Sequence, residues 1–214
     1  MVTSPAPRLW DISQTLRPEL PVWPGDTAFS RGRRWTQGSD SPVTVSFFET
    51  TVHAGAHADA PLHYSEGGLS AAEAPLDAYL GPCRLVDARG QGRAITAAFV
   101  GAAVVDPPPR VLFRTFERFP RDQWVDDFTA VEAEAIAVLA GMGVRLIGLD
   151  SPSLDPQESK TMDAHRAILA ADMRVLEGLV LDDPPAGDYE LIALPLKLEG
   201  LDASPVRAVL RSLR

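Results

Sequence analysis

The sequence predicts an α/β fold, a single domain in which strands and helices share one core. The chain of 214 residues suits one domain, because domains usually contain roughly 100–200 residues. Segments rich in β-branched and aromatic residues alternate with segments of helical periodicity. Its 19 prolines favour loops and an irregular sheet over a regular, doubly wound one.

Four segments have the composition of buried strands. Each combines β-branched, aliphatic or aromatic residues with few polar ones. They are residues 43–52 (VTVSFFETTV), 110–115 (RVLFRT), 144–149 (VRLIGL) and 189–195 (YELIALP). We expect them to be core strands; the pattern does not give their order.

One helix is predicted over residues 130–140. Thr129 stands three residues before Glu132, which is the spacing of a capping box, and an apolar periodic run follows. Gly141 is expected to end this helix.

A second helix is predicted over residues 162–171. Thr161 or Asp163 would cap its N-terminus. A short link then leads to Glu177 and to a strand-like stretch at residues 178–181.

The charge balance excludes polyanionic partners. Lys and Arg number 20 against 29 Asp and Glu, which gives a net charge of −9, so nucleic acid and anionic membrane surfaces would repel the protein on average. The single cysteine, Cys83, cannot form an internal disulfide, and the N-terminus lacks a signal-peptide pattern. We therefore expect a cytoplasmic location.

The candidate site begins with the run HAGAHADAPLH at residues 53–63. His53, His57, Asp59 and His63 all occupy odd positions, so in an extended chain their side chains would share one face, while alanines would take the other. Neutral imidazole and carboxylate groups are typical ligands of catalytic zinc or a related divalent ion. The alternative is a histidine cluster held by hydrogen bonds alone.

Two further candidates lie far along the chain. A lone helical histidine such as His165 is often a surface or capping residue. Glu177 stands among apolar residues, and a buried carboxylate is costly without a cationic partner. A metal ion would account for both residues.

At this point the chain resembles the cyclase-like metal hydrolases, and among them the bacterial kynurenine formamidases, also called arylformamidases. The histidine run resembles the signature HxGTHxDxPxH, and four more segments extend the similarity over nearly the whole chain. They are PVWPGD at 21–26, LDSPSLDPQESKTMDAH at 149–165, VLEGLVLD at 175–182 and YELIALPLKLEGLDASPVRAVL at 189–210. The resemblance implies a mixed β-sheet with flanking helices, and a homodimer.

The resemblance also implies a role for each candidate. Two divalent ions per subunit are expected, usually zinc, although these ligands also accept manganese. The first ion would be bound by His53, His57 and Asp59, and the second by Asp59, His165 and Glu177, with Glu177 reaching both. His63 would donate or accept a proton, and Trp23 would contact the substrate. Ala56 departs from the usual Thr or Ser, which removes a hydroxyl but no ligand.

The expected activity is metal-dependent hydrolysis of N-formyl-L-kynurenine, a small aryl formamide, to L-kynurenine and formate. The metal would activate a water molecule at neutral pH, which fits a chain with no GxSxG, phosphate-loop or HExxH motif. One alternative is a related amidase acting on another formamide or a cyclic amide. The other is a metal-binding or structural protein without turnover.

Overall fold

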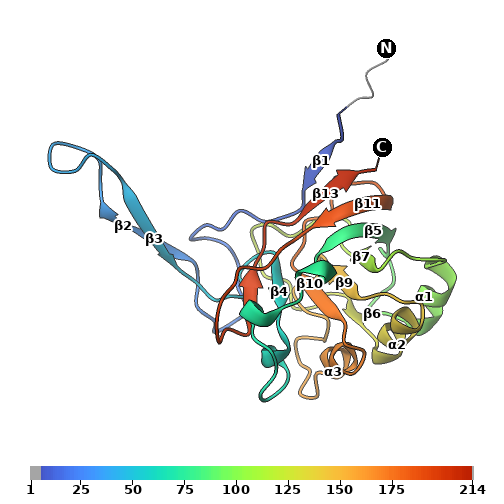
Figure 1. Cartoon of the computed structure of the whole chain (residues 1–214). Helices are drawn as coiled ribbons and strands as arrows, with labels where there is room; N and C mark the ends of the chain where they lie inside the picture. The colour runs from blue at the N-terminus through green and yellow to red at the C-terminus, as the bar shows by residue number, and fades with distance from the viewer. Residues whose placement is uncertain (1–5, 214) are drawn as a thin grey trace, which may run out of the picture.

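The computed structural model describes residues 6–213. Its centre is a nine-stranded mixed sheet (Figure 1). In sheet order the strands are β1 Leu9–Asp11, β13 Val209–Ser212, β11 Gly187–Ile192, β5 Leu80–Asp87, β7 Arg110–Arg114, β9 Leu146–Leu149, β10 Arg174–Glu177, β4 His57–Asp59 and β12 Ala203–Pro205. Strands β5, β7, β9 and β10 are parallel, and the strands on either side of them pair antiparallel. The expected mixed α/β sheet is confirmed.

Three helices connect the parallel strands. Helices α1 Ala97–Ala103, α2 Ala133–Gly141 and α3 Asp163–Ala170 each lie between two successive parallel strands, as such crossovers require. Figure 1 shows them side by side along the sheet. None of the helices in the described part of the chain has both the length and the apolar character needed to cross a membrane.

The strand residues alternate between two cores. On β7, Val111 and Phe113 pack in the cluster that includes the helices, whereas Leu112 packs in the cluster on the opposite face. The continuous apolar sequence of this strand follows from burial on both faces. The predicted strands at 110–115, 144–149 and 189–195 are confirmed as β7, β9 and β11, each with shifted ends.

The start of α2 differs from the prediction. Its N-cap is Glu132, and Thr129 instead donates a hydrogen bond from Oγ1 to the carbonyl oxygen of Gly92 at 2.8 Å. The residues between them form strand β8, Ala130–Val131, which pairs with β6, Ala94–Ile95. Tertiary strand pairing therefore overrides the local capping signal. The helix does end at Gly141.

The region around α3 also differs. Neither Thr161 nor Asp163 caps the helix; they bond to each other, with Thr161 Oγ1 donating to Asp163 Oδ2 at 2.9 Å. The following strand is Arg174–Glu177, so the strand-like assignment of residues 178–181 is wrong. Gly178 has φ +64° and ends the strand directly after Glu177.

The prediction of a core strand at residues 43–52 is wrong in its location. Strand β3, Val45–Glu49, pairs only with β2, Ser30–Trp35, and the two form an arm that projects from the body (Figure 1). All five residues of β3 are exposed, including Phe47 and Phe48. The composition of a strand shows that it needs apolar contacts but does not show which part of the molecule supplies them.

Candidate metal centre

The pairing of β4 with β10 places three of the candidate donors together. Glu177 lies directly opposite His57, and Val175 opposite Asp59. Paired residues share a face, so His57, Asp59 and Glu177 all project to the side where Val175 packs with the helices. Ala56 and Ala58 pack in the opposite core, so the side chain at position 56 faces away from the donors.

A close backbone approach fixes the turn before β4. A Cβ atom on Gly178 would lie 2.5 Å from the carbonyl oxygen of Gly55, so only glycine permits this contact. The same Gly55 carbonyl oxygen lies 3.0 Å from His57 Nδ1 and accepts a hydrogen bond from it, which directs His57 Nε2 toward the carboxylates.

Helix α3 supplies His165 in its first turn. The Asp155 carboxylate accepts hydrogen bonds from the backbone amides of Ala164 and His165 at 3.0 and 3.1 Å, and so caps the helix from a preceding loop. It also lies 2.6 Å from His165 Nδ1. His165 Nε2 is left to face Asp59 and Glu177.

The five donors converge at separations typical of a shared ion. The distances are His53 Nδ1 to Asp59 Oδ1 3.1 Å, His57 Nε2 to Asp59 Oδ1 3.4 Å, His57 Nε2 to Glu177 Oε2 3.4 Å, His165 Nε2 to Asp59 Oδ2 3.3 Å and His165 Nε2 to Glu177 Oε1 3.5 Å. Two ligands that each lie about 2.1 Å from an ion at tetrahedral angles stand roughly 3.4 Å apart.

Unpartnered polar atoms support a metal ion here. Both carboxylate oxygens of Asp59 and the Nε2 atom of His165 are buried without a hydrogen-bond partner among the described residues. Leaving such atoms unpaired is costly, and an ion would satisfy all three. The donor set of imidazoles and carboxylates therefore fits a divalent metal.

The charges of the cluster depend on one another. Burial alone would raise the pKa of Asp59, but the surrounding imidazoles hold it well below its usual range. Burial alone would lower the pKa of His57, but Asp59 and Glu177 raise it to about 10. Protons on the imidazoles can thus offset the buried carboxylates, and a metal ion would replace those protons when it binds.

A cavity of about 350 Å³ opens beside this cluster. Its lining includes four aromatic side chains, Trp23, Phe116, Phe119 and Trp124, together with His53, His57, His63 and Glu177. Trp23 is partly exposed and packs edge-to-face on Trp124, with ring centroids 5.4 Å apart. Both the expected proton carrier and the expected substrate-contacting indole therefore line the same cavity as three of the metal donors.

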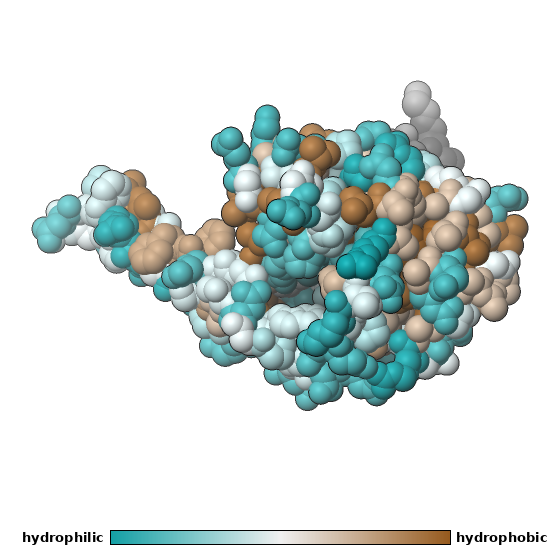
Figure 2. Space-filling model, turned by 90° about the horizontal axis from the view of Figure 1, so that it is seen from below, coloured by the Kyte–Doolittle hydropathy of each residue, from teal (hydrophilic) through white to brown (hydrophobic). Residues whose placement is uncertain are grey.

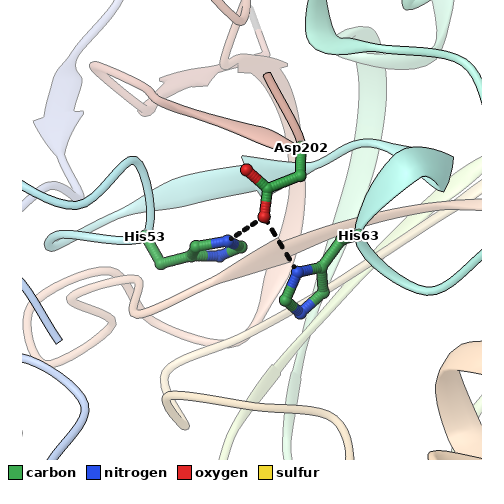
Figure 3. Close-up of side chains that lie close together, drawn as sticks. All are labelled: His53, His63 and Asp202. Carbon is green, nitrogen blue, oxygen red and sulfur yellow. Dashed lines mark hydrogen bonds and ion pairs between the residues drawn. The ribbon is translucent and has the colours of Figure 1, made fainter. Parts of the chain in front are cut away.

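His63 reaches this cavity differently from the expectation. The extended arrangement holds only for β4: His53 lies in the turn before this strand, and after it the chain forms the 3₁₀ helix η1, Pro61–His63. His63 nevertheless lies against His53, with ring centroids 4.4 Å apart. Its Nδ1 atom lies 3.2 Å from Asp202 Oδ2 (Figure 3).

Two acids beside the histidines are absent from the residues predicted to form the site. Asp155 contacts His165, and Asp202 contacts both His53 and His63. Asp202 is 149 residues from His53 in the chain, so no local spacing connects them. The segments that carry the family resemblance contain both acids, which is the only sequence signal that points to them.

Comparison with known proteins identifies the family of this chain. Residues 10–156 match the model of the Cyclase family. Over 206 residues, 96% of this chain, it is 57% identical to a kynurenine formamidase of Maricaulis maris and 54% identical to one of Sphingopyxis alaskensis, covering 99% of each. A solved structure described as a potential metal-dependent hydrolase with cyclase activity has a TM-score of 0.84 and 30% identity, covering 98% of this chain and 100% of that one.

A mixed sheet that carries imidazoles and carboxylates toward an aromatic cavity defines the class of a metal-dependent hydrolase. The chain belongs to the Cyclase family and, within it, to the group of the kynurenine formamidases. The family resemblance of the sequence is confirmed.

We predict that ion binding depends on both buried carboxylates. Asp59→Asn and Glu177→Gln keep the side-chain size but remove a charge, so each variant should bind at least one equivalent of metal fewer than the unmodified protein. Zinc should also raise the melting temperature of each metal-free variant less than that of the unmodified protein. Elemental analysis and thermal unfolding measure the two effects. Asp188→Asn, which alters an exposed ion pair with Arg84, is the control, and full metal occupancy in both site variants would contradict the prediction.

Proposed function

We propose that this protein is an amide hydrolase that converts N-formyl-L-kynurenine to L-kynurenine and formate. The observation that carries the proposal is the five-donor cluster beside an aromatic cavity, in a chain 57% identical to a kynurenine formamidase. Residues 1–214 would act as one hydrolase domain, and the lone buried thiol of Cys83 is compatible with a reducing cytoplasm.

The proposed metal centre contains two divalent ions, of which zinc suits the donors best. His53, His57 and Asp59 would hold one, and Asp59, His165 and Glu177 the other, with the two Glu177 oxygens directed toward different histidines. When bound, the metals would supply an activated water and polarise the formyl carbonyl.

His63 would provide the proton that the leaving amine needs. An aryl amine departs poorly as an anion, so a general acid must protonate its nitrogen. The Nδ1 atom of His63 lies 3.2 Å from Asp202 Oδ2, so Nε2 is the nitrogen that would act on the substrate, and the side chain lines the cavity.

The aromatic lining of the cavity suits the aryl ring. Trp23 and Trp124 pack edge-to-face on each other and both line this space, and indole groups bind aromatic rings by offset or edge-to-face contact. Among the described residues that line the cavity there is no lysine or arginine to pair with a substrate carboxylate. This lining supports a second candidate, a broader activity on neutral aryl formamides or cyclic amides.

The test is an assay of formate release by metal-free protein during stepwise addition of zinc or manganese. N-formylkynurenine should be hydrolysed faster than isatin or a cyclic imide. Preference for a cyclic substrate would favour the second candidate. No turnover of any substrate by metal-loaded protein would leave only a binding role.

We predict that Trp23→Ala raises KM about tenfold or more, because the ring contact is lost. An unchanged KM with lower stability in this variant would make Trp23 structural.

We predict that His63→Ala keeps its bound metal but loses catalysis. General acid–base groups contribute roughly 10² to 10⁴-fold, so kcat should fall within that range. Metal content by elemental analysis should match the unmodified protein. Parallel loss of metal would instead show that His63 is a ligand.

We also propose that the protein is a homodimer held by the β2–β3 arm. A lone two-stranded hairpin is marginally stable in water, yet Trp35, Phe47 and Phe48 are each more than half exposed on this one. Figure 2 shows hydrophobic side chains along the arm where it leaves the body. The two strands carry three arginines and one glutamate, in a chain of net charge −9, so a second copy offers a complementary acidic surface.

The double variant Phe47→Ser, Phe48→Ser should shift the protein from dimer to monomer, because it removes the largest apolar groups of β3. Size-exclusion chromatography with light scattering measures this mass. Val105→Ser, at an exposed position outside the arm, should leave the mass unchanged. A double variant that remains dimeric would contradict the role of the arm.

A further inference from the structure

Asp202 lies at the end of a loop that the sheet fixes beside the histidine run. It immediately precedes β12, the edge strand that pairs with β4 in the register Ala203 to Asp59. Its carbonyl oxygen accepts a hydrogen bond from the amide of Ala60 at 2.8 Å. The backbone of Asp202 is thus held next to Asp59 by strand pairing.

One oxygen of Asp202 contacts two histidines. Oδ2 lies 3.0 Å from His53 Nε2 and 3.2 Å from His63 Nδ1, as Figure 3 shows. Because a carboxylate only accepts hydrogen bonds, both nitrogens must carry the proton they donate. In a neutral ring the other nitrogen then carries no proton and has a free lone pair. This nitrogen is Nδ1 in His53 and Nε2 in His63.

These two remaining nitrogens serve different purposes. His53 Nδ1 lies 3.1 Å from Asp59 Oδ1, within the proposed metal centre. A metal-binding histidine usually donates its other N–H to an acceptor that fixes its orientation. His63 Nε2 is left for the substrate cavity, which His63 lines.

We propose that Asp202 is a positioning residue that fixes both histidines at once, holding His53 toward the metal centre and His63 toward the substrate. The part that concerns His63 rests on the proposed function; the part that concerns His53 rests on the metal centre alone. A single carboxylate oxygen thereby connects metal binding with proton transfer.

A separate metal site formed by His53, His63 and Asp202 themselves is disfavoured by the chemistry of these side chains. His53, His63 and Asp202 offer ligand atoms within 4.8 Å of one another, so they could hold an ion themselves. A neutral imidazole has only one lone pair, and His53 would have to lose its remaining proton to bind ions through both nitrogens. The Asp202 side chain is also 40% exposed and paired, unlike the buried, unpartnered oxygens of Asp59.

The test compares metal-loaded Asp202→Asn with the unmodified protein. We expect the same number of bound ions in both proteins. A competing chelator should, however, remove one ion from the variant at a concentration 10- to 100-fold lower than from the unmodified protein, because loss of a residue that supports a metal ligand typically lowers metal affinity by about that factor. We expect kcat to fall about 10- to 100-fold with KM unchanged. Imidazole ¹⁵N spectra should show the Nδ1-protonated form of His63 in the unmodified protein and a mixture of tautomers in the variant.

A double-mutant cycle separates the effect of Asp202 on His63 from its effect on the metal centre. If Asp202 acts on catalysis through His63, Asp202→Asn should cost much less in kcat when His63 is already alanine, whereas its effect on chelator sensitivity should persist. Glu199→Gln, an exposed acid in the same loop, is the matched control for charge and should change neither readout.

Three results would overturn the proposal. These are unchanged chelator sensitivity and tautomers in Asp202→Asn, fully additive losses of kcat in the cycle, or fewer bound ions, which would make Asp202 a ligand. Thermal unfolding of each variant identifies a loss caused by misfolding, and Asp202→Ala, which should give the same pattern, checks that the asparagine amide adds no contact of its own. Absence of formamidase activity in the unmodified protein would count against the proposed function, while the chelator and tautomer readouts would still test the positioning role.

Discussion

Two carboxylates, Asp59 and Glu177, are buried beside each other, and the arrangement of the site depends on the positive charge that offsets them. Burying an unpaired charge is far more costly than burying a neutral side chain, so this part of the fold requires cations. Three imidazoles surround the pair at 3.1 to 3.5 Å. Protonated imidazoles or a bound metal ion can supply this positive charge, and a metal ion would replace imidazole protons when it binds.

The sheet makes this burial possible. The antiparallel pairing of β4 with β10 sets Glu177 opposite His57, and a slip of β4 by one residue would send Asp59 into the opposite core, away from Glu177. Gly178 allows the backbone of the two segments to meet where β10 ends. The parallel strands and their crossover helices then bring His165 to the same face. The positions of His57, Asp59 and Glu177 therefore follow from strand register, whereas His53 lies in the turn before β4 and His165 lies on α3.

Part of this could be predicted from the sequence. The alternation of His57 and Asp59 with alanines identifies a strand with one polar face, and apolar runs such as residues 110–115 identify buried strands. Register between distant strands leaves no local trace, so Asp155 and Asp202 could not be assigned from spacing. Residues 43–52 show the converse, because a strand-like composition is equally compatible with a projecting arm. Local pattern specifies the type of surface an element presents, and tertiary contacts decide where that surface lies.

The outer partners of the three metal-directed histidines differ in a way that matches the needs of the site. His57 is held by a carbonyl of its own turn and His165 by Asp155, which also caps its helix, so these two rings are fixed by buried, local structure. His53 is held by Asp202, which is partly exposed and shared with His63. The two buried rings are thus held by contacts that do not involve Asp202. On the side that faces the cavity, one carboxylate oxygen contacts both His53 and His63, the proposed proton carrier, so the orientations of these two rings depend on the same group.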